Sequence, residues 1–175
     1  MESTTYFQEF KILEDSFSKM LRTIEEKDLR LQDLAYNDPL TQLFSRTYLI
    51  EFLIPNLNSK SHPYTILYID LDNFSKLNDT FGHDFGDLVL VDFTDKIKNI
   101  FQDDVIVRLG GDEFIIITYE EEIETIKTKF ADLNEILINP IIIKDVSIFV
   151  SFSAGLSNFP EDGSNFFEIL KYADL

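Results

Sequence analysis

The chain has 175 residues, which is enough for one domain and an additional element, and 45% of them are hydrophobic, as in an ordinary globular protein. Its formal net charge of −17 disfavours a nucleic-acid-binding surface, and a nucleotide bound to such a chain would need metal ions to screen its phosphates. The absence of cysteine excludes disulfides and zinc–thiolate sites.

The N-terminal residues carry no basic segment followed by an apolar one, so a signal peptide is not expected. No apolar run in the sequence is long enough to cross a bilayer. We therefore expect a cytoplasmic protein that does not insert into a membrane.

Residues 1–36 are predicted to form a helix with a narrow apolar seam. Its apolar side chains recur at alternating intervals of three and four residues, and Lys27 holds the one polar position of the series. The series comprises Phe10, Leu13, Phe17, Met20, Ile24, Leu31 and Leu34. This spacing favours a parallel two-stranded coiled coil, and hence a homodimer that could receive a signal from an upstream sensor domain. The alternative is a single amphipathic helix packed on its own domain.

Residues 37–175 are predicted to form an α+β domain. In chain order, we expect a helix over 45–57, a loop over 56–63, a strand over 64–71, a helix over 74–80 and a loop over 81–86. There follow a helix from Asp87, its N-cap, to Ile100, a hairpin over 105–117, a helix over 120–137, strands over 141–143 and 147–155, and a last helix from Asn165. This order is typical of a sheet covered by helices.

The predicted hairpin carries two adjacent acids at its tip. Two apolar runs flank the turn Gly110-Gly111-Asp112-Glu113, and the glycines leave room for a bulky ligand to approach the backbone. Asp70 ends the apolar strand over 64–71, so all three acids converge if the hairpin pairs beside that strand. A hard cation such as Mg²⁺ would relieve their mutual repulsion. The alternative is that Asp112 merely forms the turn and Asp70 merely ends the strand.

Several segments, in order and with matching spacing, resemble one family. They are Asp38-Pro39-Leu40-Thr41-Gln42-Leu43-Phe44-Ser45-Arg46, Tyr68 to Phe74, Leu77 to Asp87, Arg108 to Phe114, Ser153-Ala154-Gly155 and Tyr172-Ala173-Asp174. From about residue 38 onward, the chain resembles the GGDEF-domain diguanylate cyclases. These enzymes condense two GTP into cyclic di-GMP and release two pyrophosphates. The resemblance implies a mostly antiparallel, palm-like sheet and two domains that face each other, one GTP on each.

The resemblance also implies roles for individual residues. Metal ligands would be Asp70, the carbonyl of Leu71, Asp112 and Glu113, binding Mg²⁺ or, in its place, Mn²⁺. Asp112 and Glu113 would be catalytic, with Asp112 helping to deprotonate the attacking 3′-hydroxyl. Asn78 and Asp87 would bind guanine, and backbone amides of Asp72, Asn73, Phe74 and Ser75 would cradle phosphates, with Gly110 and Gly111 admitting the substrate.

The chain departs from the family pattern at three places. Ser75 stands where the family usually has a phosphate-contacting lysine, and Lys76 is its neighbour. The sequence stops at Leu175, before the basic residues of the family's final helix, so a truncated domain with weak or no activity is expected. Phe101 replaces the arginine of the inhibitory R-x-x-D site that ends here at Asp104, so product inhibition through this site is not expected.

Three functional hypotheses remain from the sequence. The first is a Mg²⁺-dependent diguanylate cyclase that is dimerised through its N-terminal helix. The second is a domain that binds GTP without turnover and acts as a regulatory or dimerisation module, as Ser75 and the missing basic residues would allow. The third is a purely structural coiled-coil output domain that binds no nucleotide.

Overall fold

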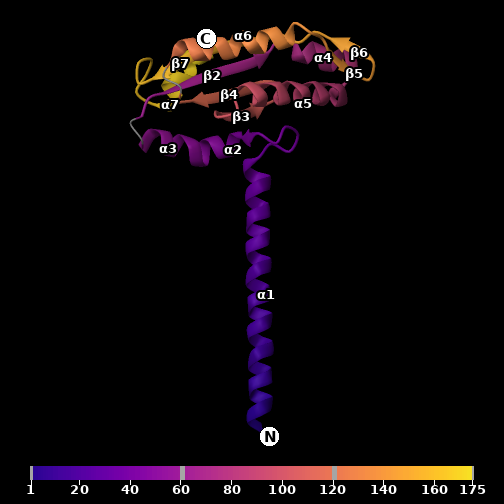
Figure 1. Ribbon diagram of the computed structural model, residues 1–175, viewed down its shortest axis with the longest axis vertical. Coiled ribbons are helices and arrows are strands. Elements are labelled where there is room, and N and C mark those ends of the chain that lie inside the picture. The colour runs from indigo at the N-terminus through magenta and orange to yellow at the C-terminus, as the bar shows by residue number, and fades with distance from the viewer. Residues whose placement is uncertain (1, 60–61, 120–121, 175) are drawn as a thin grey trace. The chain divides into compact units, whose positions relative to one another are not determined.

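A computed structural model of the protein describes residues 2–59, 62–119 and 122–174. The chain divides into two compact units, Met1–Tyr36 and Asn37–Leu175, shown in Figure 1. The first unit contains the helix α1 (Glu2–Tyr36), and the second contains all the strands that the described residues form.

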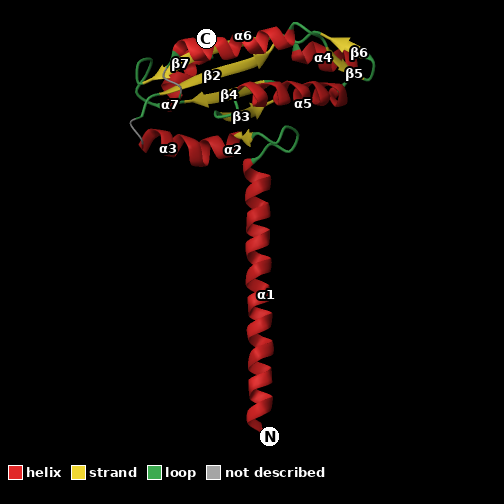
Figure 2. Ribbon diagram, in the orientation of Figure 1, coloured by secondary structure: helices red, strands yellow, loops and turns green. Residues whose placement is uncertain are grey.

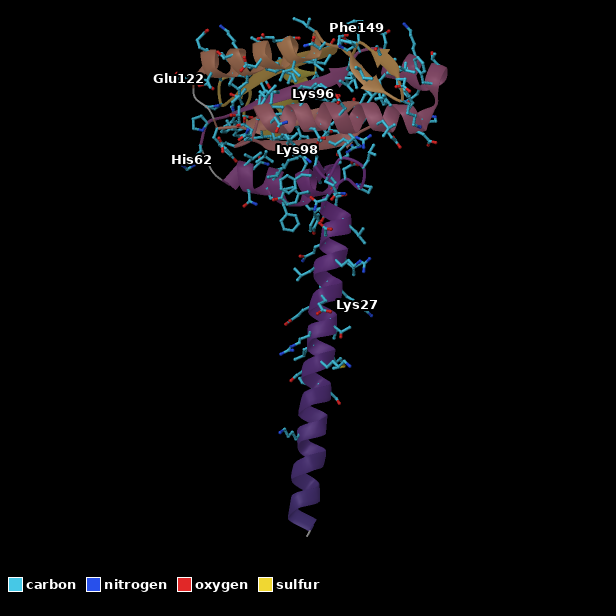
Figure 3. All side chains as sticks on the ribbon, turned by 45° about the vertical axis from the view of Figure 1, so that its right-hand side comes forward. Lys27, His62, Lys96, Lys98, Glu122 and Phe149 are labelled. Carbon is cyan, nitrogen blue, oxygen red and sulfur yellow. The ribbon has the colours of Figure 1, made fainter. Side chains whose placement is uncertain are left out.

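The predicted seam of α1 is exposed wherever its side chains are described. Phe17, Met20, Ile24, Leu31 and Leu34 are between 48% and 65% exposed. Lys27 projects from the same helix (Figure 3). The side chains of Phe10 and Leu13 lie outside the described part of the chain. Across the described ranges, no helix is both long enough and apolar enough to cross a bilayer.

The second unit is built on a five-stranded sheet with the strand order β1-β3-β4-β2-β7 (Figure 2). The strands are β1 (Phe44–Ser45), β2 (Tyr64–Leu71), β3 (Val105–Gly110), β4 (Glu113–Thr118) and β7 (Phe152–Phe159). Only the β1–β3 pair is parallel. A separate hairpin joins β5 (Ile141–Ile143) to β6 (Val146–Ile148). The α+β fold with a mostly antiparallel sheet is therefore confirmed.

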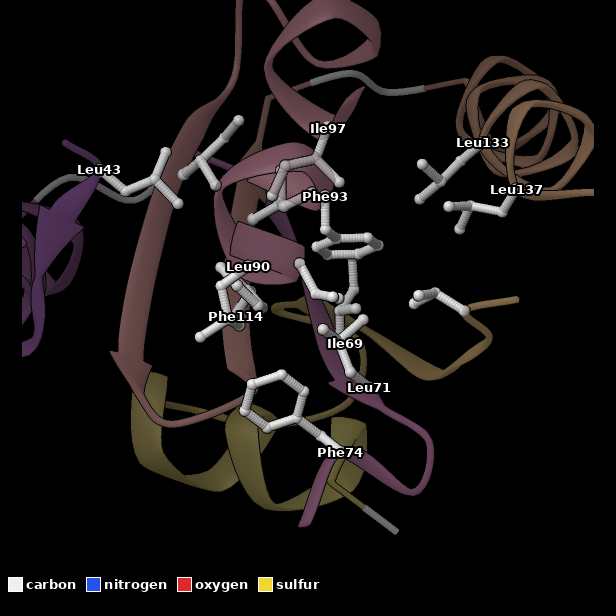
Figure 4. Packing of buried hydrophobic residues seen from close by; sticks show 14 of the residues in the cluster. Leu43, Ile69, Leu71, Phe74, Leu90, Phe93, Ile97, Phe114, Leu133 and Leu137 are labelled. Carbon is white, nitrogen blue, oxygen red and sulfur yellow. The ribbon is translucent and has the colours of Figure 1, made fainter. Parts of the chain in front are cut away.

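Helices cover both faces of the sheet because β2 is apolar on both sides. Leu67, Ile69 and Leu71 pack with α5 (His83–Ile100) and α6 (Ile123–Leu137). Figure 4 shows Phe93 of α5 and Leu133 of α6 in this core. Burying each such side chain contributes about 1.5–3 kcal/mol.

The alternate residues of β2 face the opposite core. Ile66 packs there with residues of the π-helical segment η1 (Leu49–Leu53), α3 (Ile54–Ser59) and α7 (Phe166–Ala173). Gly155 of β7 lets α7 approach closely, because a Cβ there would lie 1.7 Å from the carbonyl oxygen of Ala173. The close approach places the end of α7 beside the strand that carries Asp70.

Two predicted boundaries around the helices were wrong. The loop expected over 81–86 is mostly helix: α4 (Phe74–Phe81) is followed at once by α5, and Gly82, with a φ of +87°, forms the break. The ring of Phe81 stacks on that of Phe85, which is buried, so packing extends the helix toward its N-terminus. Asp87 therefore lies inside α5 and is not its N-cap.

Other boundaries also differ from the prediction. The helix expected over 45–57 extends to residue 59 and consists of α2 (Arg46–Tyr48), η1 and α3. Ser45 caps it, because its Oγ accepts a hydrogen bond of 3.3 Å from the Tyr48 N–H. The strand expected over 147–155 is divided between β6 and β7, since β6 turns back on β5 while β7 pairs with β2.

Candidate active site

The hairpin brings its acids beside the end of β2. In the β2–β4 register, Asp70 is the direct partner of Glu113. The Leu71 N–H also donates to the Asp112 carbonyl at 3.3 Å. Gly110 and Gly111 have φ values of +148° and +55°, which residues with a side chain rarely adopt. The turn therefore requires glycine at both positions, and pairing of its strands places three acids at one end of the sheet.

Asp70 lies in a strongly acidic environment. Its pKa is raised by partial burial and then by the nearby charges of Asp112, Glu113, Asp72 and Asp174. Among the described residues, no group of three or more His, Asp or Glu side chains is arranged so that it alone could hold a metal ion. A magnesium ion usually binds through one or two carboxylates together with water and substrate phosphates. Asp70 and Glu113 are two carboxylates that the register places together, so their chemistry fits a site of this kind.

Tyr68 is a neighbour of this acidic group that the sequence did not single out. Its hydroxyl donates a hydrogen bond to Glu113 Oε1. Burial, this hydrogen bond and the charge of Glu113 raise the pKa of Tyr68, so the phenol stays protonated and remains a donor. Tyr68 lies two residues before Asp70, on the same face of the strand, which is the signal that could have drawn attention to it.

The loop after β2 is anchored to the start of β7. The carboxylate of Asp72 accepts hydrogen bonds of 2.7 Å from both the Ser151 and Ser153 hydroxyls. The Asp72 N–H donates to the Ser151 carbonyl at 2.9 Å. Asn73 follows in a left-handed conformation, with a φ of +58°, and α4 begins at Phe74. The proposed phosphate loop is thus held by β7, and the Asp72 carboxylate is occupied by serine hydroxyls.

Ser75 and Lys76 are both exposed, but only Lys76 carries a charge. Ser75 is exposed in the first turn of α4. The ammonium of Lys76 reaches back and donates to Asn73 Oδ1 at 2.8 Å. A cation is therefore present at the start of α4 even though Ser75 carries none.

The two predicted guanine-binding residues lie on adjacent helices. Asn78 is on α4, and its Oδ1 is buried without a hydrogen-bond partner among the described residues. A Cβ on residue 86 would lie 2.0 Å from that oxygen, so Gly86 makes room for the Asn78 amide. Asp87 is the next residue of α5 and is exposed. That oxygen is an acceptor and costs stability while it is unsatisfied, whereas the amide nitrogen of Asn78 is not among the buried atoms without a partner.

The other side of the hairpin is held by a paired acid. Arg108 donates to Asp38 Oδ1 at 2.9 Å and, through two nitrogens, to the Gly111 carbonyl at 2.8 and 3.0 Å. The Thr41 N–H and hydroxyl also donate to Asp38. Partial burial opposes ionisation of Asp38, but the hydrogen bonds from Thr41 and Arg108 outweigh it and lower the pKa. This network fixes the acidic turn to the segment before β1.

Asp104 is also paired. Its Oδ2 accepts a hydrogen bond of 2.6 Å from Lys129 Nζ, and the Asp104 side chain is only 6% exposed. The same ammonium lies 5.4 Å from the centre of the Phe101 ring. The carboxylate that remains from the inhibitory motif is therefore engaged by a lysine of α6.

A family model described as "Diguanylate cyclase, GGDEF domain" matches residues 35–175, and the chain belongs to this family. The chain is 31% identical over 166 residues to the bifunctional diguanylate cyclase/cyclic di-GMP phosphodiesterase MucR of Pseudomonas aeruginosa, covering 93% of this chain and 24% of MucR.

Two further proteins illustrate the range of relatives. Diguanylate cyclase DgcP of Escherichia coli is 36% identical over 107 residues, which cover 59% of this chain and 31% of DgcP. The crystal structure of the coiled coil and GGDEF domain of DgcB from Caulobacter crescentus matches with a TM-score of 0.78 at 22% identity, covering 93% of this chain and 88% of that one. That likeness shows the fold. The chain spans about a quarter of MucR and about a third of DgcP.

Proposed function

We propose that this chain is a diguanylate cyclase module that condenses two GTP into cyclic di-GMP. The observation that carries the proposal is the pairing of Asp70 with Glu113 beside a Gly-Gly turn that carries Asp112. The raised pKa of Asp70 supports it, because acids crowded in this way favour a bound divalent cation. Mg²⁺, or Mn²⁺ in its place, would polarise the α-phosphate and stabilise the pyrophosphate leaving group.

The chain's own residues would then perform defined tasks. Asp70, Glu113, Asp112 and the Leu71 carbonyl would hold the cation. Asp112 would accept the proton of the attacking 3′-hydroxyl. The amides from Asp72 to Ser75, at the start of α4, would hold the phosphates, as the positive end of a helix favours.

Guanine would lie beside α4 and α5. Since Asn78 Oδ1 is buried against Gly86, we assign the amide Nδ2 as the donor to an acceptor on the guanine ring. Asp87 is exposed and free of a capping role inside α5, so its carboxylate can accept from the guanine N1–H and N2–H. A purine that presents the reverse pattern, such as adenine, would leave both groups mismatched.

The reaction needs two copies of the domain, each supplying a 3′-hydroxyl to the other's GTP. The exposed seam of α1 supports a parallel coiled coil as the means of bringing them together in a cytoplasmic homodimer. Tethering would raise the local concentration of one domain around the other and could pass on a signal from a sensor domain.

The direct test is turnover of GTP by the purified protein. Formation of cyclic di-GMP with two pyrophosphates per product, dependent on Mg²⁺ and on protein concentration, is the expected result. GTP binding with no product at high protein concentration would refute the cyclase assignment.

GTP binding without product is the outcome that the alternative candidate, a GTP-binding regulatory module, predicts. The exposed Ser75 favours it, because no lysine stands at that position of the phosphate loop. Calorimetry with GTP and Mg²⁺, combined with a pyrophosphate assay, separates the two, since the regulatory module predicts binding without pyrophosphate release. An absence of any thermal shift with GTP and Mg²⁺ would instead support a purely structural domain.

A further inference from the structure

Tyr68 is placed to act on Glu113 from the neighbouring strand. Tyr68 is opposite Ile115 in the β2–β4 register, and Asp70 is opposite Glu113. Tyr68 and Glu113 are therefore diagonal neighbours on one face of the sheet, within reach of a long aromatic side chain. The hydrogen bond from the Tyr68 hydroxyl to Glu113 Oε1 uses this geometry.

The tyrosine lies between two cavities at the acidic end of the sheet. One, of about 360 Å³, is lined by Glu113 together with Arg46 and Lys171. The other, of about 250 Å³, is lined by Asp70 and Ser153. Tyr68 and Asp174 line both. Glu113 and Asp70 thus line separate cavities, and Tyr68, which donates to Glu113, lines both.

We propose that Tyr68 is a positioning residue that holds Glu113 in the orientation needed to bind the catalytic cation. The inference rests on the proposed function. The hydroxyl engages Oε1 and leaves Oε2 available to a cation. Because Asp70, Glu113 and Asp174 are all acidic, a neutral donor is the partner that can fix Glu113 without cancelling the charge that attracts the metal. Hydrogen bonds to ligating carboxylates commonly change metal affinity by about 10- to 100-fold.

The structure offers a substitution that separates this role from packing. The ring of Tyr68 packs against the core formed by Ile66, Ile115 and their neighbours, and phenylalanine keeps that ring. Tyr68→Phe therefore removes the hydroxyl alone. Tyr64→Phe is the matched control, because Tyr64 lies on the same strand at its other end, where its ring stacks on Phe159 at 5.0 Å.

The experiment measures how much Mg²⁺ improves nucleotide binding. The probe is 3′-deoxy-GTP, which cannot react because it lacks the attacking hydroxyl. Its affinity for the full chain is determined by calorimetry in EDTA and in excess Mg²⁺, and the ratio gives the metal-dependent gain. We expect Tyr68→Phe to leave the affinity in EDTA unchanged and to reduce the gain by about tenfold. Tyr64→Phe should change neither.

Each other outcome overturns the inference in a distinguishable way. A full gain in Tyr68→Phe, or a larger one, would show that the hydroxyl does not orient a metal ligand, while leaving the proposed function intact. An equal loss of affinity with and without Mg²⁺ would show a role in packing. Nucleotide binding by the wild-type chain with no gain from Mg²⁺ would refute the metal site itself, and the inference with it.

Discussion

The carboxylates on the two sides of the acidic hairpin lie in opposite electrostatic environments. On one side, Asp38 is neutralised by Arg108 and bonded by Thr41, and its pKa is lowered. On the other side, Asp70 stands opposite Glu113. Its pKa is raised, and the described charges that shift this pKa are all acidic. Paired charges stabilise the fold, whereas crowded like charges cost stability and persist where a ligand compensates them. The contrast supports the proposal that the cation binds on the β2 side of the hairpin.

The strongest way to break this contrast is to remove one of the crowded acids. Glu113→Gln should reduce cyclic di-GMP formation by on the order of a thousandfold, because a ligand to the cation is lost. The folded structure should be retained, since a like-charge contact is removed. Pyrophosphate release and thermal unfolding, measured on the same sample, check both statements. Wild-type turnover by Glu113→Gln would exclude Glu113 from the site.

On the side of the paired acid Asp38, a substitution should lower the stability of the fold instead. Arg108→Ala leaves Asp38 without its cation and releases the Gly111 carbonyl, so we expect a loss of about 2 kcal/mol in the free energy of unfolding. Chemical denaturation measures it. Lys127→Ala is the control, because its ion pair with Glu124 is largely exposed and should contribute little. Equal effects of the two substitutions would contradict the assigned role of Arg108.

The pH dependence of stability should have opposite signs on the two sides. Asp70 has a raised pKa in the folded state, so its ionised form costs stability above that pKa, and the cost disappears as the pH falls below the ordinary value of 3.8. In EDTA at neutral pH, Asp70→Asn should therefore stabilise the protein by roughly 0.2–1 kcal/mol, the range for like charges facing each other across strands. The gain should vanish in acid.

Asp38→Asn provides the opposite case. Asp38 has a lowered pKa, so its contribution to stability is present above its ordinary pKa and is lost as the pH falls through the folded value. Denaturation of both variants across the acid range tests the comparison. If the change in the free energy of unfolding had the same sign for Asp70→Asn and Asp38→Asn, the contrast between the two sides would be contradicted.

The smallest expected effect concerns Asp104, which is paired with a basic side chain as Asp38 is. Because Lys129 engages its carboxylate and Phe101 replaces the motif's arginine, added cyclic di-GMP should leave the cyclase rate unchanged. Initial rates over a range of product concentrations measure this. Strong inhibition that Asp104→Ala abolishes would show that the site still binds product.

The sequence predicted the parts of the fold that depend on local pattern. The strand over 64–71 is apolar on both faces and is central, and the glycines at 110 and 111 form the tight turn expected of them. The meeting of Asp70 with Glu113 followed from a single assumption, that the hairpin pairs beside that strand.

What the sequence did not reveal depends on tertiary packing. The start of α5 was placed too late because the Phe81–Phe85 stacking and the burial of Phe85 are contacts that periodicity does not contain. Lys129 and Asp104 are 25 residues apart in sequence, and their hydrogen bond forms only because α6 packs near the end of α5. Likewise, the sequence places Tyr68 on the same face of its strand as Asp70. Its hydrogen-bond partner, Glu113, depends on the register between β2 and β4.

The position of β7 has a consequence for how the chain folds during its synthesis. β2 is bordered by β4, which follows it after α4, α5 and β3, and by β7, which is synthesised later still. While a nascent chain lacks β7, one edge of the apolar strand β2 offers unpaired amides and carbonyls to any neighbouring polypeptide. On the ribosome, the same late strand that anchors Asp72 would also be the one that ends this exposure to misassembly.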